Sequence, residues 1–223
     1  MDTVDIRSYY NLLNFTRPIS SKSTHLFCVD GFQRQGNNSL RKLLLETFPT
    51  ISINRALTHE VSNIERSLSK GIPCVVTLRR SLGTASSLVS YQNKKDNIEH
   101  IYKDEKTLDA YIRSMIFKET IDHILDTHLE YFRYILNAKD KYKNNFFIAT
   151  FDTLLYSSHN LMEDIRKKFN IENISNYKFE NKLINIPGHN STANDTIEQY
   201  ILNNFTLKLN ELDKLYDMIL GII

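Results

Sequence analysis

Two glycines near the start of the chain, Gly31 and Gly36, mark the stretch whose residues are best suited to chemistry. An apolar run of strand length precedes them, and a stretch with helical spacing of leucines follows. A strand, a glycine loop and a helix start, in this order, make a nest of backbone N–H groups that favours an anion. We therefore predict an anion-binding loop at residues 31–39.

The loop has the G-x-x-x-x-G spacing of a P-loop but lacks the residues that follow in a metal-dependent NTPase. Asn37 and Asn38 stand where such an enzyme needs Lys and then Ser or Thr, for the phosphates and for Mg²⁺. The cation of this chain is Arg34, inside the loop. A guanidinium and amide donors can hold an anion without a metal.

A second candidate pair follows another apolar run, at residues 74–78. Arg79 comes directly after this run, and Ser87 lies eight residues later, on the helix expected at 84–92. An arginine at a strand end and a serine on the next helix can approach one ligand group together. A surface arginine and a helical serine are each common, so the pair indicates a ligand site only in combination with the loop at 31–39.

A histidine, His59, also follows a predicted strand, and the resemblance to a known family that is described below implies that it is the general base. It stands twenty residues before Arg79 and follows the strand expected at 51–57. Histidine suits proton transfer because its ordinary pKa lies near neutrality. Glu60 is the rival base, and a third interpretation gives His59 only a place in the first turn of a helix.

The elements expected around these residues alternate between strands and helices. Strands are predicted at 26–29, 51–57, 74–78 and 146–151. Helices are predicted at 37–48, 60–70 with Thr58 as the cap, 84–92, 107–138 as one helix or a pair, 154–169 and 195–220 with a break near 203–204. Residues 93–106 and 173–194 are expected to be mostly loop, with Asp152 near a helix start.

This alternation predicts an α/β fold, with βαβ units and right-handed crossovers. We expect a three-layer α/β/α arrangement around a central parallel sheet of four to five strands. Ligands of such folds bind at the carboxyl ends of the strands. Because Arg34, His59 and Arg79 each follow a predicted strand, the fold is expected to gather them at one edge.

Composition narrows the function classes. The 223 residues, 41% of them hydrophobic, suffice for a single domain spanning 1–223, with residues 1–24 as a leader packed on its edge. The net charge of +2 gives no basic surface for nucleic acid. No stretch approaches the ~20 apolar residues of a membrane span, so we expect a cytoplasmic protein. Cys28 and Cys74 are expected to be reduced core residues. His123 and His128 are five positions apart, so they do not share a helix face as an i, i+4 pair of metal ligands would.

The stretch Arg34-Gln35-Gly36-Asn37-Asn38-Ser39-Leu40-Arg41 resembles the 5′-phosphosulfate loop of the sulfotransferase family. The segment from Arg79 to Ser87 resembles the segment with which that family grips the 3′-phosphate of its donor. The resemblance implies a P-loop NTPase-like fold and metal-free transfer of a sulfuryl group from 3′-phosphoadenosine 5′-phosphosulfate (PAPS), which leaves 3′,5′-bisphosphoadenosine. It implies catalytic roles for His59 and Arg34, and donor-binding roles for Arg34, Gln35, Gly36, Asn37, Asn38, Ser39, Arg79 and Ser87.

The chain departs from the family at several positions. Gln35 and Asn38 replace Ser and Thr of the loop, Leu57 replaces a Lys before the base, and Ser81 and Gly83 replace Pro and Asp of the second segment. The loop at 185–190 lacks the family's Arg-Lys-Gly. These changes keep two alternatives open: an inactive P-loop-like nucleotide-binding or assembly protein, and a small-molecule kinase. The acceptor is expected to be a small molecule or glycan with a hydroxyl or amine, and neither its identity nor the oligomeric state follows from the sequence.

Overall fold

The computed structural model describes residues 25–54, 58–96, 104–171 and 191–222. They form two compact units, each built from two stretches of chain. Unit 1 comprises Met1–Leu78 and Ala138–Ile184, and unit 2 comprises Arg79–Asn137 and Asn185–Ile223. The predicted leader at 1–24 and most of the predicted loop at 173–194 lie outside the described residues.

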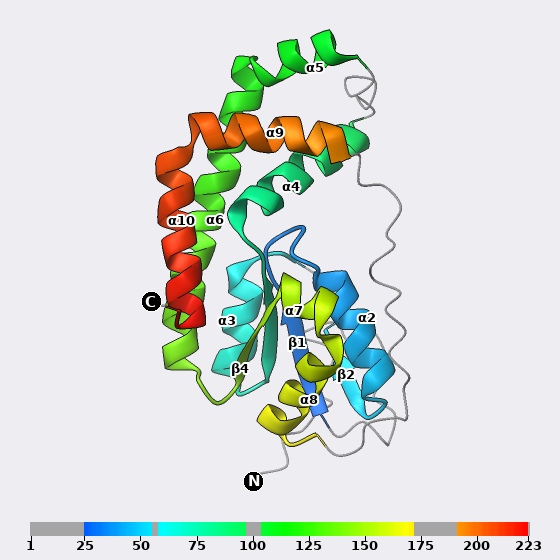
Figure 1. Cartoon of the computed structure of the whole chain (residues 1–223). Coiled ribbons are helices and arrows are strands. Elements are labelled where there is room, and N and C mark those ends of the chain that lie inside the picture. The colour runs from blue at the N-terminus through cyan, green and yellow to red at the C-terminus, as the bar shows by residue number, and fades with distance from the viewer. Residues whose placement is uncertain (1–24, 55–57, 97–103, 172–190, 223) are drawn as a thin grey trace. The chain divides into compact units, whose positions relative to one another are not determined.

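Unit 1 is built on a four-stranded sheet in which all strands are parallel (Figure 1). The order is β2-β1-β3-β4, so β1 and β3 are central. Strands of a parallel sheet are buried on both faces, which accounts for the continuous apolar runs in the sequence. The predicted α/β fold with a parallel sheet is thus confirmed, with four strands: β1 (His25–Asp30), β2 (Ile51–Ile53), β3 (Cys74–Leu78) and β4 (Phe146–Thr150).

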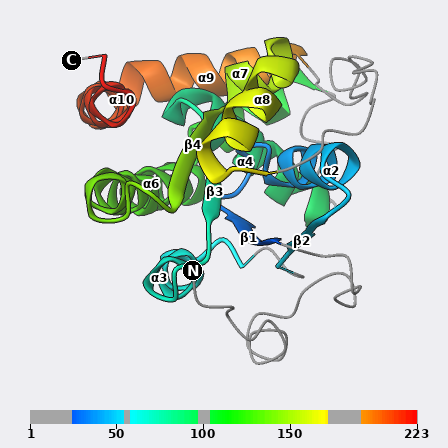
Figure 2. The ribbon, with the colours of Figure 1, turned by 90° about the horizontal axis from the view of Figure 1, so that it is seen from below.

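Helices cover both faces of this sheet (Figure 2). Side chains of β1 alternate between the two faces. Phe27 and Val29 join the hydrophobic core beneath α2 (Asn37–Thr47) and α8 (Ser158–Phe169). On the other face, Cys28 and Asp30 meet Asn63 of α3 (Val61–Ser69), whose amide nitrogen lies 2.6 Å from the Asp30 carboxylate. The short helix α7 (Phe151–Tyr156) follows β4 directly and precedes α8.

Three local expectations in unit 1 have different outcomes. Asp152 lies in the first turn of α7, as predicted. Cys28 and Cys74 are reduced and buried, also as predicted, and burial together with contact to Cys28 raises the pKa of the Cys74 thiol. The prediction that Thr58 is the N-cap residue of the helix after β2 is wrong, because that residue is Glu60. The Thr58 hydroxyl accepts from the N–H of Glu60 at 3.3 Å and donates to Asp30.

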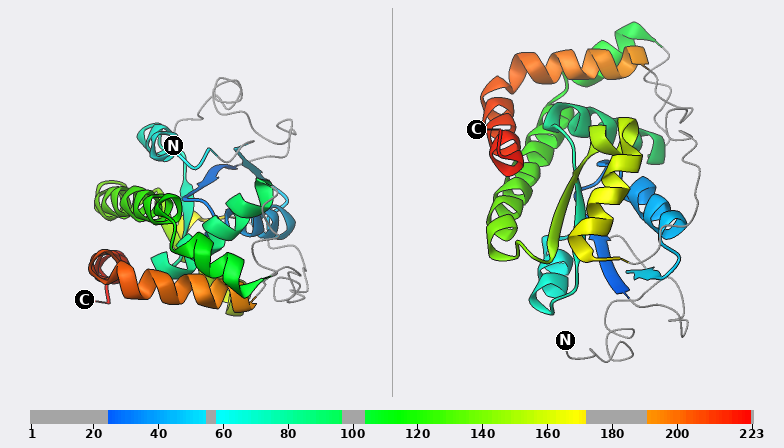
Figure 3. Two further views of the ribbon diagram at one scale, coloured as in Figure 1. Left: turned by 90° about the horizontal axis from the view of Figure 1, so that it is seen from above. Right: turned by 60° about the horizontal axis from the view of Figure 1, so that its bottom comes forward.

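The described elements of unit 2 are all helices. They are α4 (Ser81–Lys95), α5 (Glu105–Ile112), α6 (Met115–Lys141), α9 (Ser191–Asn204) and α10 (Thr206–Leu220), with the last residues of α6 belonging to unit 1. The predicted stretch 107–138 is therefore a helix pair. The predicted break near 203–204 is confirmed at Phe205, where α9 and α10 meet in a sharp bend (Figure 3). The predicted loop at 93–106 is helical at both ends, since α4 extends to Lys95 and α5 begins at Glu105.

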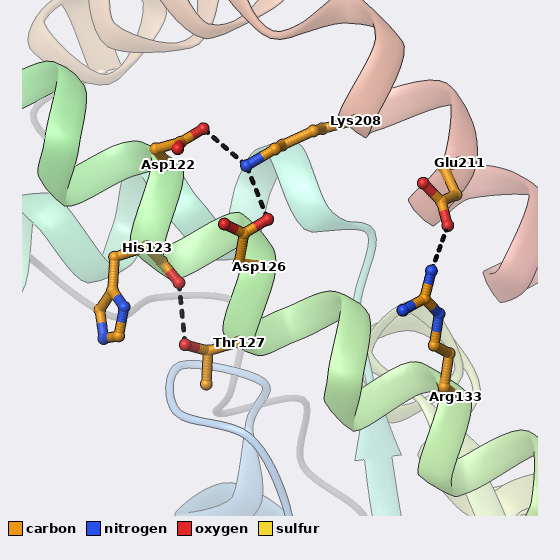
Figure 4. Close-up of polar contacts among 7 residues, drawn as sticks. All are labelled: Asp122, His123, Asp126, Thr127, Arg133, Lys208 and Glu211. Carbon is orange, nitrogen blue, oxygen red and sulfur yellow. Dashed lines mark hydrogen bonds and ion pairs between the residues drawn. The ribbon is translucent and has the colours of Figure 1, made fainter.

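Ion pairs tie the first half of α10 to α6 in unit 2. Lys208 reaches Asp122 and Asp126, each at 2.6 Å, and Arg133 reaches Glu211 at 2.7 Å (Figure 4). The two helices run in the same direction, because the later residue on α10 meets the later residue on α6. Between them lie buried aromatic side chains, such as those of Phe132 and Tyr216. No helix in the described part of the chain is long and apolar enough to cross a membrane.

Candidate functional site

The predicted anion loop joins the end of β1 to the start of α2 in unit 1. Arg34 is exposed and has a left-handed backbone, with φ of 61°. Gly36 also has a left-handed backbone, with φ of 92°, and is the N-cap residue of α2. A Cβ at Gly36 would lie 3.0 Å from side-chain carbons of Leu154 and Phe151. The loop thus needs glycine at 36 for its backbone and for its close approach to α7.

Asn37 braces this loop against the sheet. Its amide nitrogen donates to the carbonyl oxygens of Phe32, at 2.8 Å, and Gly31, at 3.2 Å. Its amide oxygen accepts from the hydroxyl of Thr77 on β3 at 2.8 Å. The side chain is 3% exposed. Because all of these atoms serve the loop itself, only the backbone N–H of Asn37 remains suited to the predicted ligand contact.

The first turn of α2 supplies the other predicted donors. The first backbone hydrogen bond of the helix runs from the N–H of Leu40 to the carbonyl of Gly36, at 2.9 Å. The N–H groups of the three preceding residues have no partner within a helix at this position. No acidic residue stands in this first turn, so the positive end of the helix dipole can attract an anion. Among the predicted contact residues here, Asn38 is exposed, Ser39 is half-buried and the side chain of Gln35 is buried.

His59 is tied to the same loop, although the sequence separates the two by more than twenty residues. Its Nδ1 lies 2.7 Å from the carbonyl oxygen of Gly31. A carbonyl oxygen can only accept, so Nδ1 carries the proton in the neutral ring and Nε2 carries the lone pair. His59 is half-buried. The predicted base is thus brought to the predicted anion loop, with its basic nitrogen defined.

Glu60, the rival base, is engaged differently. Its carboxylate accepts a hydrogen bond from the hydroxyl of Ser62, at 2.9 Å, and the side chain is exposed. Glu60 is also the N-cap residue of α3. These contacts place its carboxylate at the start of that helix, and they favour His59 for a role at the loop.

Asp30 is the residue of this site that the sequence reasoning missed. It is the last residue of β1 and is fully buried. Its carboxylate accepts from Gly31, Thr58, His59 and Asn63. The sequence feature that could have indicated Asp30 is a single carboxylate at the end of an otherwise apolar strand, directly before a glycine. A buried acid at such a position needs several donors, and all but the N–H of Gly31 come from a distant part of the chain.

In unit 2, Arg79 and Ser87 lie at α4. Arg79 directly follows the last residue of β3, and its guanidinium lies over the first turn of α4. A Cβ at Gly83 would lie 3.0 Å from Nη2 of Arg79, so glycine makes room for the guanidinium. Ser87 is buried on the same helix. The neighbouring Arg80 has another task, since it pairs with Asp213 and Asp217 of α10.

The structure thus distributes the predicted residues over both units. The loop residues Arg34 to Ser39 and the base His59 belong to unit 1, and Arg79 and Ser87 belong to unit 2. The loop at 185–190, where the family has Arg-Lys-Gly, lies outside the described residues. Comparisons of the chain with protein-family models, with curated proteins and with solved structures find no match.

Proposed function

We propose that the chain is a sulfotransferase of the P-loop-like type. It transfers the sulfuryl group of PAPS to a hydroxyl or amine of a small-molecule or glycan acceptor. The observation that carries the proposal is that one loop serves two needs of this transfer. Residues 31–36 present Arg34 and the start of α2, and the carbonyl of Gly31 also holds the ring of His59.

The proposed binding roles follow the two segments that resemble those of the sulfotransferase family. Arg34 and the backbone N–H groups of residues 35–39 hold the 5′ side of the donor. Arg79 and Ser87 hold its 3′-phosphate. A transferring sulfuryl group carries less charge than a γ-phosphoryl group, so the loop does not need a metal-binding Ser or Thr at position 38.

The proposed mechanism is a direct displacement at sulfur. The acceptor oxygen or nitrogen attacks the sulfur, and Nε2 of His59 takes the acceptor's proton. The bond between sulfur and the bridging oxygen of the 5′-phosphate breaks, and its electron pair stays on that oxygen. Arg34 and the positive end of α2 stabilise the charge that builds on the leaving bisphosphate.

Binding is tested by calorimetry with 3′,5′-bisphosphoadenosine in the presence of a chelator. We expect binding by the intact chain, and a loss of about 1.5–3 kcal/mol in Arg34→Ala and in Arg79→Ala, because each removes a charge-assisted contact. Arg113→Ala is the control, since Arg113 is exposed and pairs only locally with Asp109. Unchanged affinity in Arg79→Ala would show that the 3′ assignment is wrong.

Transfer is tested with PAPS and a panel of phenols, amines and sugars. We expect His59→Ala to lower turnover by about 10²–10⁴-fold and to leave bisphosphate affinity nearly unchanged. Glu60→Gln is the matched variant and should keep its activity. If Glu60→Gln abolishes turnover and His59→Ala does not, the base is Glu60.

A binding or assembly protein without chemistry is the second candidate, and one observation favours it. Asn37 stands where a P-loop has its catalytic lysine, and its side-chain amide is hydrogen-bonded to Gly31, Phe32 and Thr77 of the protein itself. Bisphosphate binding without turnover on any acceptor would favour this candidate. Thermal stabilisation by ATP with Mg²⁺, but not by the bisphosphate, would instead indicate a kinase.

A further inference from the structure

The carboxylate of Asp30 accepts five hydrogen bonds at the site. Oδ1 accepts from the backbone N–H of Gly31 at 2.9 Å and of His59 at 3.1 Å. Oδ2 accepts from the N–H of Thr58 at 3.2 Å, from the Thr58 hydroxyl at 2.9 Å and from the amide of Asn63 at 2.6 Å. All five groups can donate, which matches a deprotonated carboxylate that can only accept.

These contacts act on a residue in an unfavourable backbone conformation. His59 has φ of 59°, a left-handed value that is uncommon for a non-glycine residue. Oδ1 of Asp30 binds the N–H of His59 itself, and Oδ2 binds both donors of the residue before it. The end of β1 therefore holds the backbone on which the imidazole is mounted.

The neighbouring residue, Gly31, also fixes the side chain of His59, because its carbonyl oxygen accepts a hydrogen bond from the imidazole ring. Its carbonyl oxygen faces Nδ1 of His59. If the ring carried its proton on Nε2, two lone pairs would face one another across this contact. Only the Nδ1–H tautomer fits as long as the backbone of residues 58–59 keeps its place.

We infer that Asp30 is the positioning residue of His59, and that it sets the ring as the Nδ1–H tautomer with the lone pair on Nε2. The base role that this serves rests on the proposed function, but the tautomer does not. Asp30 does not touch the reacting atoms. It acts through the backbone of Thr58 and His59 and through the adjoining Gly31 carbonyl.

The test is long-range ¹H–¹⁵N NMR on the full-length ¹⁵N-labelled chain, with the His59 signals identified by their loss in His59→Gln. We expect His59 of the wild-type chain to be the Nδ1–H tautomer at pH 8. Asp30→Asn keeps the size of the side chain but replaces one acceptor oxygen with a donor, so His59 should revert to the Nε2–H tautomer that free histidine favours. The carboxylate of Glu60 accepts from Ser62, so Glu60→Gln should leave the His59 signals as they are in the wild-type chain.

Thr58→Val is the second variant, for the case that Asp30→Asn does not fold. It removes, from an exposed side chain, a hydroxyl that donates to Oδ2 and accepts from the N–H of Glu60 at 3.3 Å, and it should increase the share of the Nε2–H tautomer. An Nδ1–H tautomer that persists in every folded variant overturns the inference. So does a wild-type chain in which His59 is the Nε2–H tautomer.

Turnover separates this inference from the proposed function. With PAPS and an acceptor, Asp30→Asn should lower kcat by about 10–100-fold, as loss of an orienting partner does, and bisphosphate affinity should stay within twofold. A wild-type chain that shows the tautomer change in Asp30→Asn but transfers no sulfuryl group refutes the proposed function and keeps Asp30 as the positioning residue. His59-dependent turnover that Asp30→Asn leaves unchanged refutes the positioning role alone.

Discussion

Two histidines of this chain have different surroundings, and their chemistry differs accordingly. His59 is half-buried in unit 1, and Nδ1 has a polar partner in the Gly31 carbonyl. His128, on α6 in unit 2, is fully buried, and its ring lies 4.2 Å from that of Phe132 between centroids. Burial lowers the pKa of His128 to about 3. His128 is therefore neutral at physiological pH and belongs to the core of unit 2.

The depressed pKa of His128 predicts a loss of stability in acid. The unfolded chain binds a proton near pH 6.5 and the folded chain only near pH 3, so the contribution is fully present above pH 6.5 and is lost as the pH falls toward 3. Between pH 7 and pH 5 the loss should be about 2 kcal/mol. Urea unfolding at the two pH values measures it, and His128→Leu should show a drop smaller by this amount.

The control for this prediction lies on the same helix. His123 is exposed (Figure 4), so His123→Leu should keep the wild-type drop between pH 7 and pH 5. A new leucine in the core also changes packing, and this changes the free energy of unfolding at both pH values. The informative quantity is therefore the drop in that free energy between pH 7 and pH 5. Equal drops in His128→Leu and in the wild-type chain would contradict the prediction.

At the scale of elements, the junction of the loop with α2 depends on close packing against α7. Gly36 supplies a left-handed backbone and leaves no space for a Cβ beside Leu154 and Phe151. Gly71, in the same unit, also has a left-handed backbone, with φ of 74°, but a Cβ there would meet only the side-chain amide of Asn145 at 4.0 Å. A substitution at Gly71 therefore tests the left-handed backbone alone, whereas a substitution at Gly36 tests both the left-handed backbone and the packing against α7.

We predict that Gly36→Ala destabilises the chain more than Gly71→Ala does. A left-handed alanine costs about 1–2 kcal/mol at either position, and overpacking against α7 adds about 1–3 kcal/mol at position 36. Denaturant unfolding of both variants measures the difference. Calorimetry should also find weaker bisphosphate binding in Gly36→Ala alone. Equal losses of stability would mean that α7 moves aside without cost.

At the scale of the whole molecule, each unit is assembled from separated stretches of chain. The core of unit 1 combines Phe27 and Leu40, from before Leu78, with Leu154 and Ile165, from after Ala138. β4 also pairs with β3 along its full length. Neither stretch can therefore complete the core of unit 1 without the other.

This assembly predicts that a fragment of residues 1–137 does not form unit 1. Loss of β4, α7 and α8 would leave β3 as an unpaired edge and expose the apolar side chains beneath them. An ¹H–¹⁵N correlation spectrum of the fragment should lack the dispersion of the full-length chain, and the fragment should bind no bisphosphate. A dispersed spectrum would show that the first stretch folds without the second.

The sequence by itself determined the class of the fold and most of its elements, because these depend on local patterns. Continuous apolar runs indicate strands buried on both faces, and the helical spacing of leucines and aromatics indicates the helices between them. The strand, loop and start of α2, the helical stretch over 107–138 and a break near 203–204 follow from such patterns, whereas the structure decided that the long stretch is a pair of helices. The sulfotransfer itself stays a prediction.

Only the tertiary structure decided which partner each polar side chain has. Asp30 takes donors from residues 28 to 33 positions away, and Asn37 takes one from Thr77, forty positions away. Thr58 likewise has a distant partner, since its hydroxyl donates to the buried carboxylate of Asp30 while it accepts from the N–H of Glu60, the N-cap residue of α3. A hydroxyl, an amide or a carboxylate can be satisfied by many partners, and the fold alone determines which of them come within reach.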